Sequence, residues 1–269
     1  MPKVSNAFLR GVTALLLPPL TGCAVGSLEP LPDQLASQAE IAQGETFKHL
    51  VYLQPASGRL FFIMIEGDGT PWVQGRLPAA DPTPSNPLVF RLAANTPAPA
   101  AYVGRPCYFR LGDRECRPYH WTQGRFSPEV VDSMAVVVND LLATVAYERC
   151  VLVGHSGGGT LALLLASRVD DSCAVVTIAG PTDIHAWSSL HGYLPLVGSL
   201  NPSDEIDRLA GIQQFHLLGM RDDNVPPDLF ETAFEESSEV EIWRFEDFNH
   251  VCCWEAHWDQ LLLQLDAAL

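Results

Sequence analysis

The segment between residues 151 and 168 constrains the fold more strongly than any other part of the sequence. An apolar run rich in β-branched residues ends at Gly154, and an apolar run typical of a helix begins at Leu161. The residues between them include Gly154-His155-Ser156-Gly157-Gly158, which fits the pattern G-x-S-x-G. Small neighbours allow a serine in a strained backbone conformation to project its hydroxyl from such a turn. The pattern therefore predicts a sharp strand–turn–helix unit with Ser156 as a candidate nucleophile.

Other glycine-rich turns fit this segment less well. A P-loop requires a Lys after its glycines, and none follows here. A dinucleotide-binding loop requires G-x-G-x-x-G, but Ser156 occupies the second glycine position. A glycine-rich turn without any catalytic role stays open as the alternative.

Length and charge limit the class of protein. The chain has 269 residues, 47% of them hydrophobic, which suits one sizeable α/β domain. Its formal net charge of −16 argues against binding to nucleic acid, which requires a basic surface. The same charge argues against broad adsorption to anionic lipid head groups.

The first residues have the pattern of an export signal. Lys3 and Arg10 precede a short apolar stretch, too short to span a membrane, and residues 1–22 are expected to be a signal peptide. Leu20-Thr-Gly-Cys23 resembles the bacterial lipobox, which implies that Cys23 is lipidated and anchors the chain to a membrane. Residue 24 is Ala, which by that resemblance favours the outer membrane, with the domain facing the periplasm. An ordinary signal peptide with an incidental Cys is the alternative.

Six cysteines follow Cys23, and an even number in an exported chain suggests disulfides. Cys107 and Cys116 bracket a short polar loop and are the best pair. Cys150 and Cys173 each begin a predicted strand, so a bridge between them is possible. The adjacent residues 252 and 253 could form only an uncommon vicinal bridge. No spacing matches a familiar zinc site, so no metal is expected.

The rest of the chain alternates between strand-like and helix-like segments. Residues 23–46 are polar and are expected to be a tether, with one domain over 47–269. Alternating strands and helices predict a mainly parallel sheet with helices on both faces. Strands are expected at 47–54, 59–65, 101–104, 150–154, 174–179, 214–219 and 240–245, and helices at 88–94, 128–147, 157–168, 227–236 and 253–268, with a proline-rich loop over 75–87.

A serine nucleophile needs a histidine base and an acid that orients it, on loops beyond the carboxyl ends of parallel strands. His250 follows the last predicted strand and is the candidate base. Asp222 follows the strand at 214–219 and is the candidate acid, with Asp223 and Asp183 as competitors. Of the other histidines, His155 is expected to point away from the site and His216 to lie within the sheet. His120, His185, His191 and His257 are further competitors.

The reaction also requires donors for a developing oxyanion. The backbone N–H of Gly157, directly after the serine, is the first candidate. The turn Glu66-Gly-Asp-Gly69 follows an early apolar strand, and the N–H of Asp68 is the second candidate. A tight turn with no catalytic role is the alternative.

Together these residues resemble the α/β-hydrolase family over about residues 47–269. The serine, the aspartate in Gly219-x-x-Asp222-x-x-Val-Pro226 and the histidine occur in that family's order. The acidic turn at 66–69 departs from the His-Gly of many members and leaves the oxyanion donor in doubt. The segment between strands 174–179 and 214–219 is short, which indicates a small lid or none.

The resemblance implies a serine hydrolase that cleaves small-molecule esters at the cell envelope without a cofactor. A carboxylesterase or lipase is favoured over a peptidase, and a silent binding or assembly protein on the same scaffold is the competing class. Trp187, Leu190, Tyr193 and Leu194 could line an acyl pocket or simply pack. The oligomeric state stays open.

Overall fold

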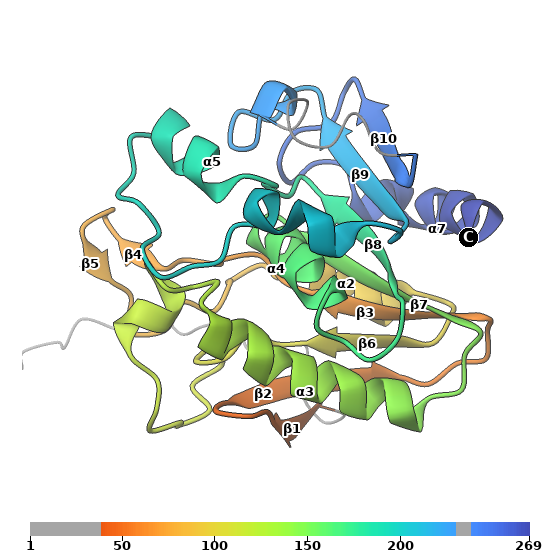
Figure 1. Ribbon diagram of the computed structural model, residues 1–269, viewed down its shortest axis with the longest axis horizontal. Helices are drawn as coiled ribbons and strands as arrows, with labels where there is room; N and C mark the ends of the chain where they lie inside the picture. The colour runs from red at the N-terminus through yellow and green to blue at the C-terminus, as the bar shows by residue number, and fades with distance from the viewer. Residues whose placement is uncertain (1–38, 230–237) are drawn as a thin grey trace, which may run out of the picture. The chain divides into compact units, whose positions relative to one another are not determined.

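The computed structural model describes residues 39–229 and 238–269. Its centre is an eight-stranded sheet in the order β1-β2-β6-β3-β7-β8-β9-β10 (Figure 1). The strands are β1 Ala39–Gln43, β2 Lys48–Gln54, β3 Leu60–Ile65, β6 Ala100–Val103, β7 Arg149–His155, β8 Ala174–Ile178, β9 Gln214–Gly219 and β10 Val240–Phe245. The pairs from β6 to β10 are parallel, whereas β1, β2 and β6 pair antiparallel. The predicted mainly parallel α/β fold is confirmed.

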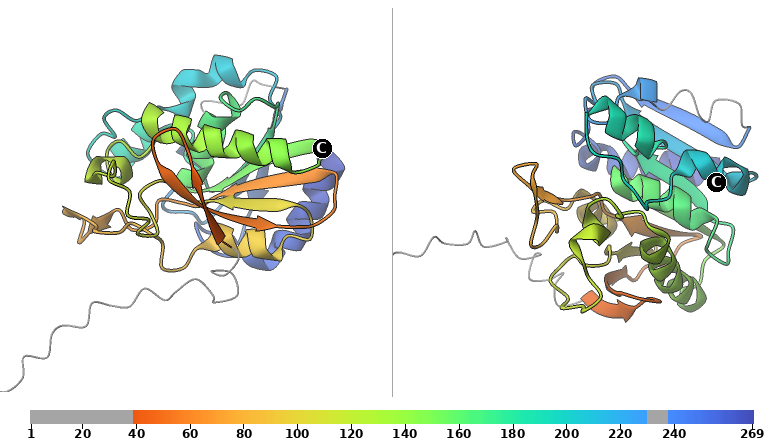
Figure 2. Two further views of the ribbon diagram at one scale, coloured as in Figure 1. Left: turned by 90° about the horizontal axis from the view of Figure 1, so that it is seen from below. Right: turned by 60° about the vertical axis from the view of Figure 1, so that its left-hand side comes forward.

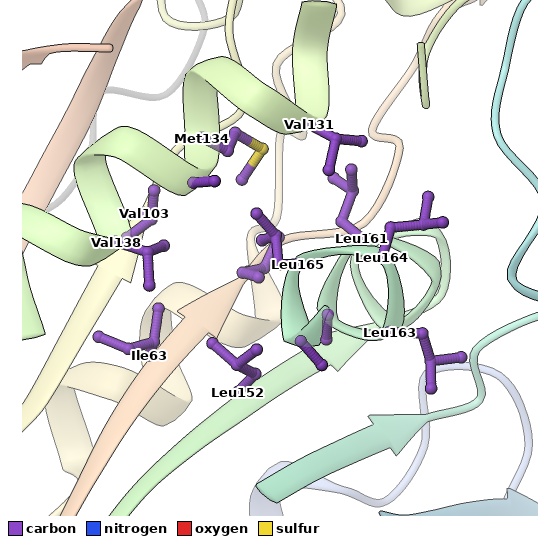
Figure 3. Packing of buried hydrophobic residues seen from close by; sticks show 14 of the residues in the cluster. Ile63, Val103, Val131, Met134, Val138, Leu152, Leu161, Leu163, Leu164 and Leu165 are labelled. Atoms are coloured by element: carbon purple, nitrogen blue, oxygen red, sulfur yellow. The ribbon is translucent and has the colours of Figure 1, made fainter. Parts of the chain in front are cut away.

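Helices cover both faces of the sheet because its central strands are apolar on both sides. All six residues of β3 are buried, and alternate residues belong to two separate hydrophobic clusters. One cluster includes residues of α3 Pro128–Thr144 and α4 Gly157–Ala166, and the other includes residues of α2 Leu88–Asn95 and α7 Trp258–Ala268. Figure 3 shows the first cluster, where Val131, Met134 and Val138 of α3 lie against the leucines of α4 above the sheet.

Smaller elements surround the carboxyl ends of the strands. A two-stranded hairpin, β4 Trp72–Val73 and β5 Leu77–Pro78, stands away from the central sheet (Figure 2). The connection from β8 to β9 contains α5 Ile184–Leu190 and the 3-10 segment η2 Pro202–Leu209. Both α5 and the hairpin lie on the left of Figure 1. The remaining 3-10 segments are η1 Pro118–Trp121, η3 Pro227–Leu229 and η4 Glu255–His257.

Several predicted boundaries were wrong. The predicted tether extends to residue 46, but Ala39–Gln43 forms β1 and pairs with β2. The last helix begins at Trp258 rather than at residue 253, because a loop and η4 precede it. The loop over 75–87 contributes β5. Of the helix expected at 227–236, Pro227–Leu229 is a 3-10 turn and the rest lies outside the described residues.

Three disulfides join the six cysteines of the domain. The structure contains the expected Cys107–Cys116 bridge. It also joins Cys150 and Cys173, which lie at the starts of the neighbouring strands β7 and β8. The third bridge joins the adjacent residues Cys252 and Cys253, which the sequence analysis regarded as uncommon.

The expected signal peptide over residues 1–22 and the lipidation site Cys23 lie outside the described residues. Over the part of the chain that the structure describes, no helix is both long and apolar enough to cross a membrane.

Candidate active site

Ser156 lies in the sharp turn between β7 and α4. Its backbone has φ +52° and ψ −127°, a combination that residues other than glycine rarely adopt. The Ser156 N–H donates to the carbonyl of Ile178 at the end of β8, at 2.9 Å. A side chain at Gly154 would collide with the backbone of Gly158, and one at Gly158 would collide with the carbonyl of Ile65. The predicted turn is therefore present, and its glycines are required by close backbone packing.

His250 and Asp222 lie beside this serine. The Ser156 hydroxyl is 3.0 Å from His250 Nε2, and His250 Nδ1 is 2.9 Å from Asp222 Oδ2. The other carboxylate oxygen of Asp222 accepts the backbone N–H groups of Asn224 and Val225 at 2.8 and 2.9 Å. The Asp222 side chain is fully buried. These bonds fix the carboxylate, which accepts a hydrogen bond from His250 Nδ1 and so favours the tautomer whose Nε2 is unprotonated and can accept the serine proton.

The competing residues lie elsewhere. Asp223 is exposed, and Asp183 caps α5 by accepting the N–H groups of His185 and Ala186. His216 is buried within β9 and bonds to Thr177 Oγ1 at 2.7 Å, and burial lowers its pKa to about 3. His120, His185, His191 and His257 make contacts other than a bond to Ser156. The structure thus brings together the three residues chosen from the sequence.

His155 does not simply point away from the site. Its Nε2–H donates to the backbone carbonyl of His250 at 2.7 Å, and the two rings lie 4.9 Å apart. Burial, and then the nearby His250, lower the pKa of His155 to about 4. A neutral His155 therefore holds the backbone of the candidate base, a contact that the sequence analysis missed.

Asn224 is a second contact that the sequence did not reveal. Its side-chain Nδ2 lies 3.0 Å from His250 Nε2, on the atom that also faces Ser156. Its backbone carbonyl accepts bonds from the ring nitrogens of Trp187 and His191 at 3.0 and 2.7 Å. The loop that carries the acid is therefore joined to the segment containing α5.

The turn at residues 66–69 packs against Ser156 and Gly157. A side chain at Gly67 would contact the Ser156 Cβ, and one at Gly157 would collide with the Asp68 carboxylate. Among the described residues, neither the Gly157 N–H nor the Asp68 N–H has a hydrogen-bond acceptor. Two free donors beside the serine suit an oxyanion hole, and their role stays a prediction.

The charge of Asp68 is compensated by two arginines. Arg105 Nη1 contacts one carboxylate oxygen, and Arg125 Nη1 lies 2.6 Å from the other. Burial would raise the pKa of Asp68, but the two guanidinium groups outweigh it and lower the pKa to about 2. The Asp68 carboxylate, which lies beside the predicted oxyanion site, is therefore paired with two cations.

Glu66, two residues earlier, has the opposite environment. Its carboxyl group accepts the N–H groups of Val89 and Phe90 in the first turn of α2, at 3.4 and 3.2 Å. Burial raises its pKa to about 7 despite these bonds. The carboxyl group is held by the amino end of α2, which favours a negative charge.

The comparisons with known proteins identify the fold. A family described as alpha/beta hydrolase fold matches residues 108–229. A structure of an alpha-beta serine hydrolase homologue from Coxiella burnetii is 15% identical, with 86% of this chain and 96% of that chain covered and a TM-score of 0.56. The chain has the α/β-hydrolase fold.

Other hydrolases are similar in structure. An esterase from Pyrococcus furiosus is 13% identical, with 88% of this chain and 92% of that chain covered and a TM-score of 0.63. An α/β serine hydrolase without a lid, from Xanthomonas campestris, is 13% identical, with 85% and 95% covered and a TM-score of 0.52. No curated protein matches the sequence significantly.

In this hydrolase fold, Ser156 opens onto a cavity of about 650 Å³. The expected pocket residues Trp187 and Tyr193 line it, as does Leu194, whereas Leu190 does not. The β4–β5 hairpin also lines the cavity through Trp72 and Arg76, and nothing in the sequence connected these residues with the site. The hydrolase fold and the cavity favour a small-molecule substrate.

No group of three or more metal-ligating side chains occurs within residues 39–229 and 238–269.

Proposed function

We propose that this protein is a serine hydrolase that cleaves ester bonds through an acyl-enzyme intermediate. The observation that carries the proposal is the continuous chain of contacts from Ser156 Oγ to His250 Nε2 at 3.0 Å and from His250 Nδ1 to Asp222 Oδ2 at 2.9 Å. The chain of contacts ends at a cavity large enough for a small ester.

In the first half of the reaction, Ser156 Oγ attacks the ester carbonyl and His250 Nε2 takes the serine proton. Asp222 stabilises the resulting imidazolium and keeps its ring oriented. When the tetrahedral intermediate collapses, the C–O bond to the leaving group breaks and His250 donates its proton to that oxygen. An alcohol departs and the acyl group stays on Ser156.

In the second half, water attacks the acyl-enzyme while His250 takes one of its protons. Collapse of the second intermediate releases the carboxylic acid, and Ser156 Oγ recovers its proton from His250. The N–H groups of Gly157 and Asp68 stabilise the oxyanion in both intermediates. Loss of one such donor typically costs about 100- to 1,000-fold in kcat.

Fluorophosphonate labelling tests the nucleophile. We expect the wild-type protein to be labelled and Ser156→Ala to be inert, while Ser189→Ala, at an exposed serine of α5, labels normally. Turnover of p-nitrophenyl esters of increasing chain length then distinguishes short-chain esterase from lipase activity. Absence of labelling in the wild type, or labelling that survives Ser156→Ala, would instead favour a silent binding protein on this scaffold.

We also propose that lipidated Cys23 anchors the enzyme to the bacterial outer membrane, facing the periplasm. The support is the lipobox-like Leu20-Thr-Gly-Cys23 after a basic and apolar leader. Palmitate labelling in cells should disappear in Cys23→Ala, and persistence of the label would contradict the anchor.

A further inference from the structure

The cluster of Asp68, Arg105 and Arg125 beside Ser156 does not balance its own charge. Two guanidinium groups face one carboxylate, so one positive charge is in excess. The arginine side chains are only 1% and 5% exposed. Because a buried charge without a partner is costly, an excess cation at this depth needs a counter-ion.

The two arginines differ in how fully they are engaged. Arg105 donates to Asp68 and to the Arg125 carbonyl, and its guanidinium lies 5.4 and 5.3 Å from the ring centres of Tyr108 and Phe126. It does not line the active-site cavity. Arg105 is therefore a structural partner of Asp68.

Arg125 faces the cavity itself. Its Nε donates to the Thr122 carbonyl at 2.7 Å and its Nη1 to Asp68 at 2.6 Å. Within the described residues its Nη2 has no acceptor, and Arg125 lines the same cavity as Ser156. One donor edge of a buried guanidinium is thus left for a ligand.

The other charged groups around the cavity do not neutralise this arginine. Asp68 and Glu66 are its only acidic lining residues among those described, and Glu66 is bonded to the amino end of α2. Arg76, on the exposed β4–β5 turn, adds a second lining cation. Although the chain has a formal charge of −16, its cavity is therefore lined by as many arginines as acidic residues.

We propose that Arg125 binds a carboxylate on the acyl part of the substrate, so that the enzyme hydrolyses half-esters of dicarboxylic acids. The acyl side is indicated because Arg125 bonds to Asp68, whose carboxylate packs against Gly157 beside the predicted oxyanion site. The leaving group lies on the other side of the serine, near His250. Guanidinium is suited to this ligand because its donors match a carboxylate in geometry and charge. This inference rests on the proposed hydrolase function.

The test compares two phenyl esters of similar length, the monophenyl ester of glutaric acid and phenyl valerate. For the wild type we expect kcat/KM to be about 10- to 100-fold higher for the anionic ester. Arg125→Gln should reduce the anionic-to-neutral ratio toward one, and Arg125→Lys should give an intermediate ratio. The control Arg208→Gln, at an exposed arginine that does not line the cavity, should keep the wild-type ratio.

A second measurement uses the intact protein and does not depend on turnover or on stable variants. Glutarate should protect wild-type Ser156 from fluorophosphonate labelling more strongly than neutral glutaramide does. Equal wild-type kcat/KM for the two esters, or equal protection by the two compounds, would overturn the inference and leave the hydrolase proposal intact. Loss of the hydrolase proposal would appear differently, as the absence of fluorophosphonate labelling itself.

Discussion

Ser156 lies between two sets of polar side chains that are built differently. On the base side, Asp222 and His250 occupy loops directly after β9 and β10, and the contact from Asp222 to His250 continues to the serine hydroxyl. On the arginine side, Asp68, Arg105 and Arg125 come from three separate loops, and both arginines form ion pairs with the Asp68 carboxylate. The role proposed for the base side is to accept and return a proton, whereas the arginine side holds a fixed charge beside the same serine.

The largest expected effect is a loss of kcat when the base side is disrupted. Asp222→Asn should lower kcat for an activated ester by about 10,000-fold, because the amide no longer holds the required histidine tautomer. Asp223→Asn changes the exposed neighbour and should leave kcat within a few-fold of wild type. A severe loss in Asp183→Asn with a mild one in Asp222→Asn would move the acid to the loop after β8.

The next largest effect is expected for a substitution on the arginine side, and it concerns the free energy of unfolding. Asp68→Asn removes the carboxylate between two buried guanidinium groups, and we expect the free energy of unfolding to fall by about 3–5 kcal/mol. Urea denaturation measures it. Asp247→Asn breaks the exposed ion pair with Arg221, and should cost less than about 1 kcal/mol. Similar losses in the two variants would show that the buried ion pairs of Asp68 contribute no more to stability than an exposed ion pair.

A smaller difference between the two sides is expected in how the free energy of unfolding changes at acidic pH. His155 has its pKa lowered by burial from 6.5 to about 4, so the unfolded chain binds the proton first and stability falls as the pH drops from 6.5 toward 4. Asp68 stays ionised in the folded state down to about pH 2, so the arginine side keeps its ion pairs over this range. His155→Gln should reduce the acid loss of stability by up to about 3 kcal/mol.

Urea melts at pH 7, 5.5 and 4.5 measure this difference, and His185→Gln at an exposed histidine is the control. Both variants should still lose some stability in acid through His49 and His216, because burial lowers the pKa of these residues to about 4 and 3. Glu66 acts with the opposite sign, since its raised pKa of about 7 makes acidification toward pH 4.5 favourable. An unchanged pH dependence in His155→Gln would contradict a neutral, buried His155.

The same comparison shows how much the sequence could predict. The fold and the base side followed from apolar runs in strand–helix alternation, because parallel strands bring loops at their carboxyl ends together. Asp68 was chosen for its backbone N–H, and nothing in the sequence connected its carboxylate with Arg105 or Arg125. Those arginines lie in loops, where no periodicity indicates which way a side chain points. The strand β1 was missed because it is short, polar and partly exposed at the sheet edge.

The close packing around the serine also determines where this protein can change. No side chain larger than hydrogen fits at Gly154 or Gly158 without moving the neighbouring backbone, and one at Gly157 would displace the Asp68 carboxylate. Selection for new substrates can therefore act little on the turn. The β4–β5 hairpin and the residues around Tyr193 and Leu194 are exposed, so we expect them to tolerate variation better. A mutant library aimed at altered specificity should concentrate on those rims, and a library centred on the serine turn should yield mostly inactive protein.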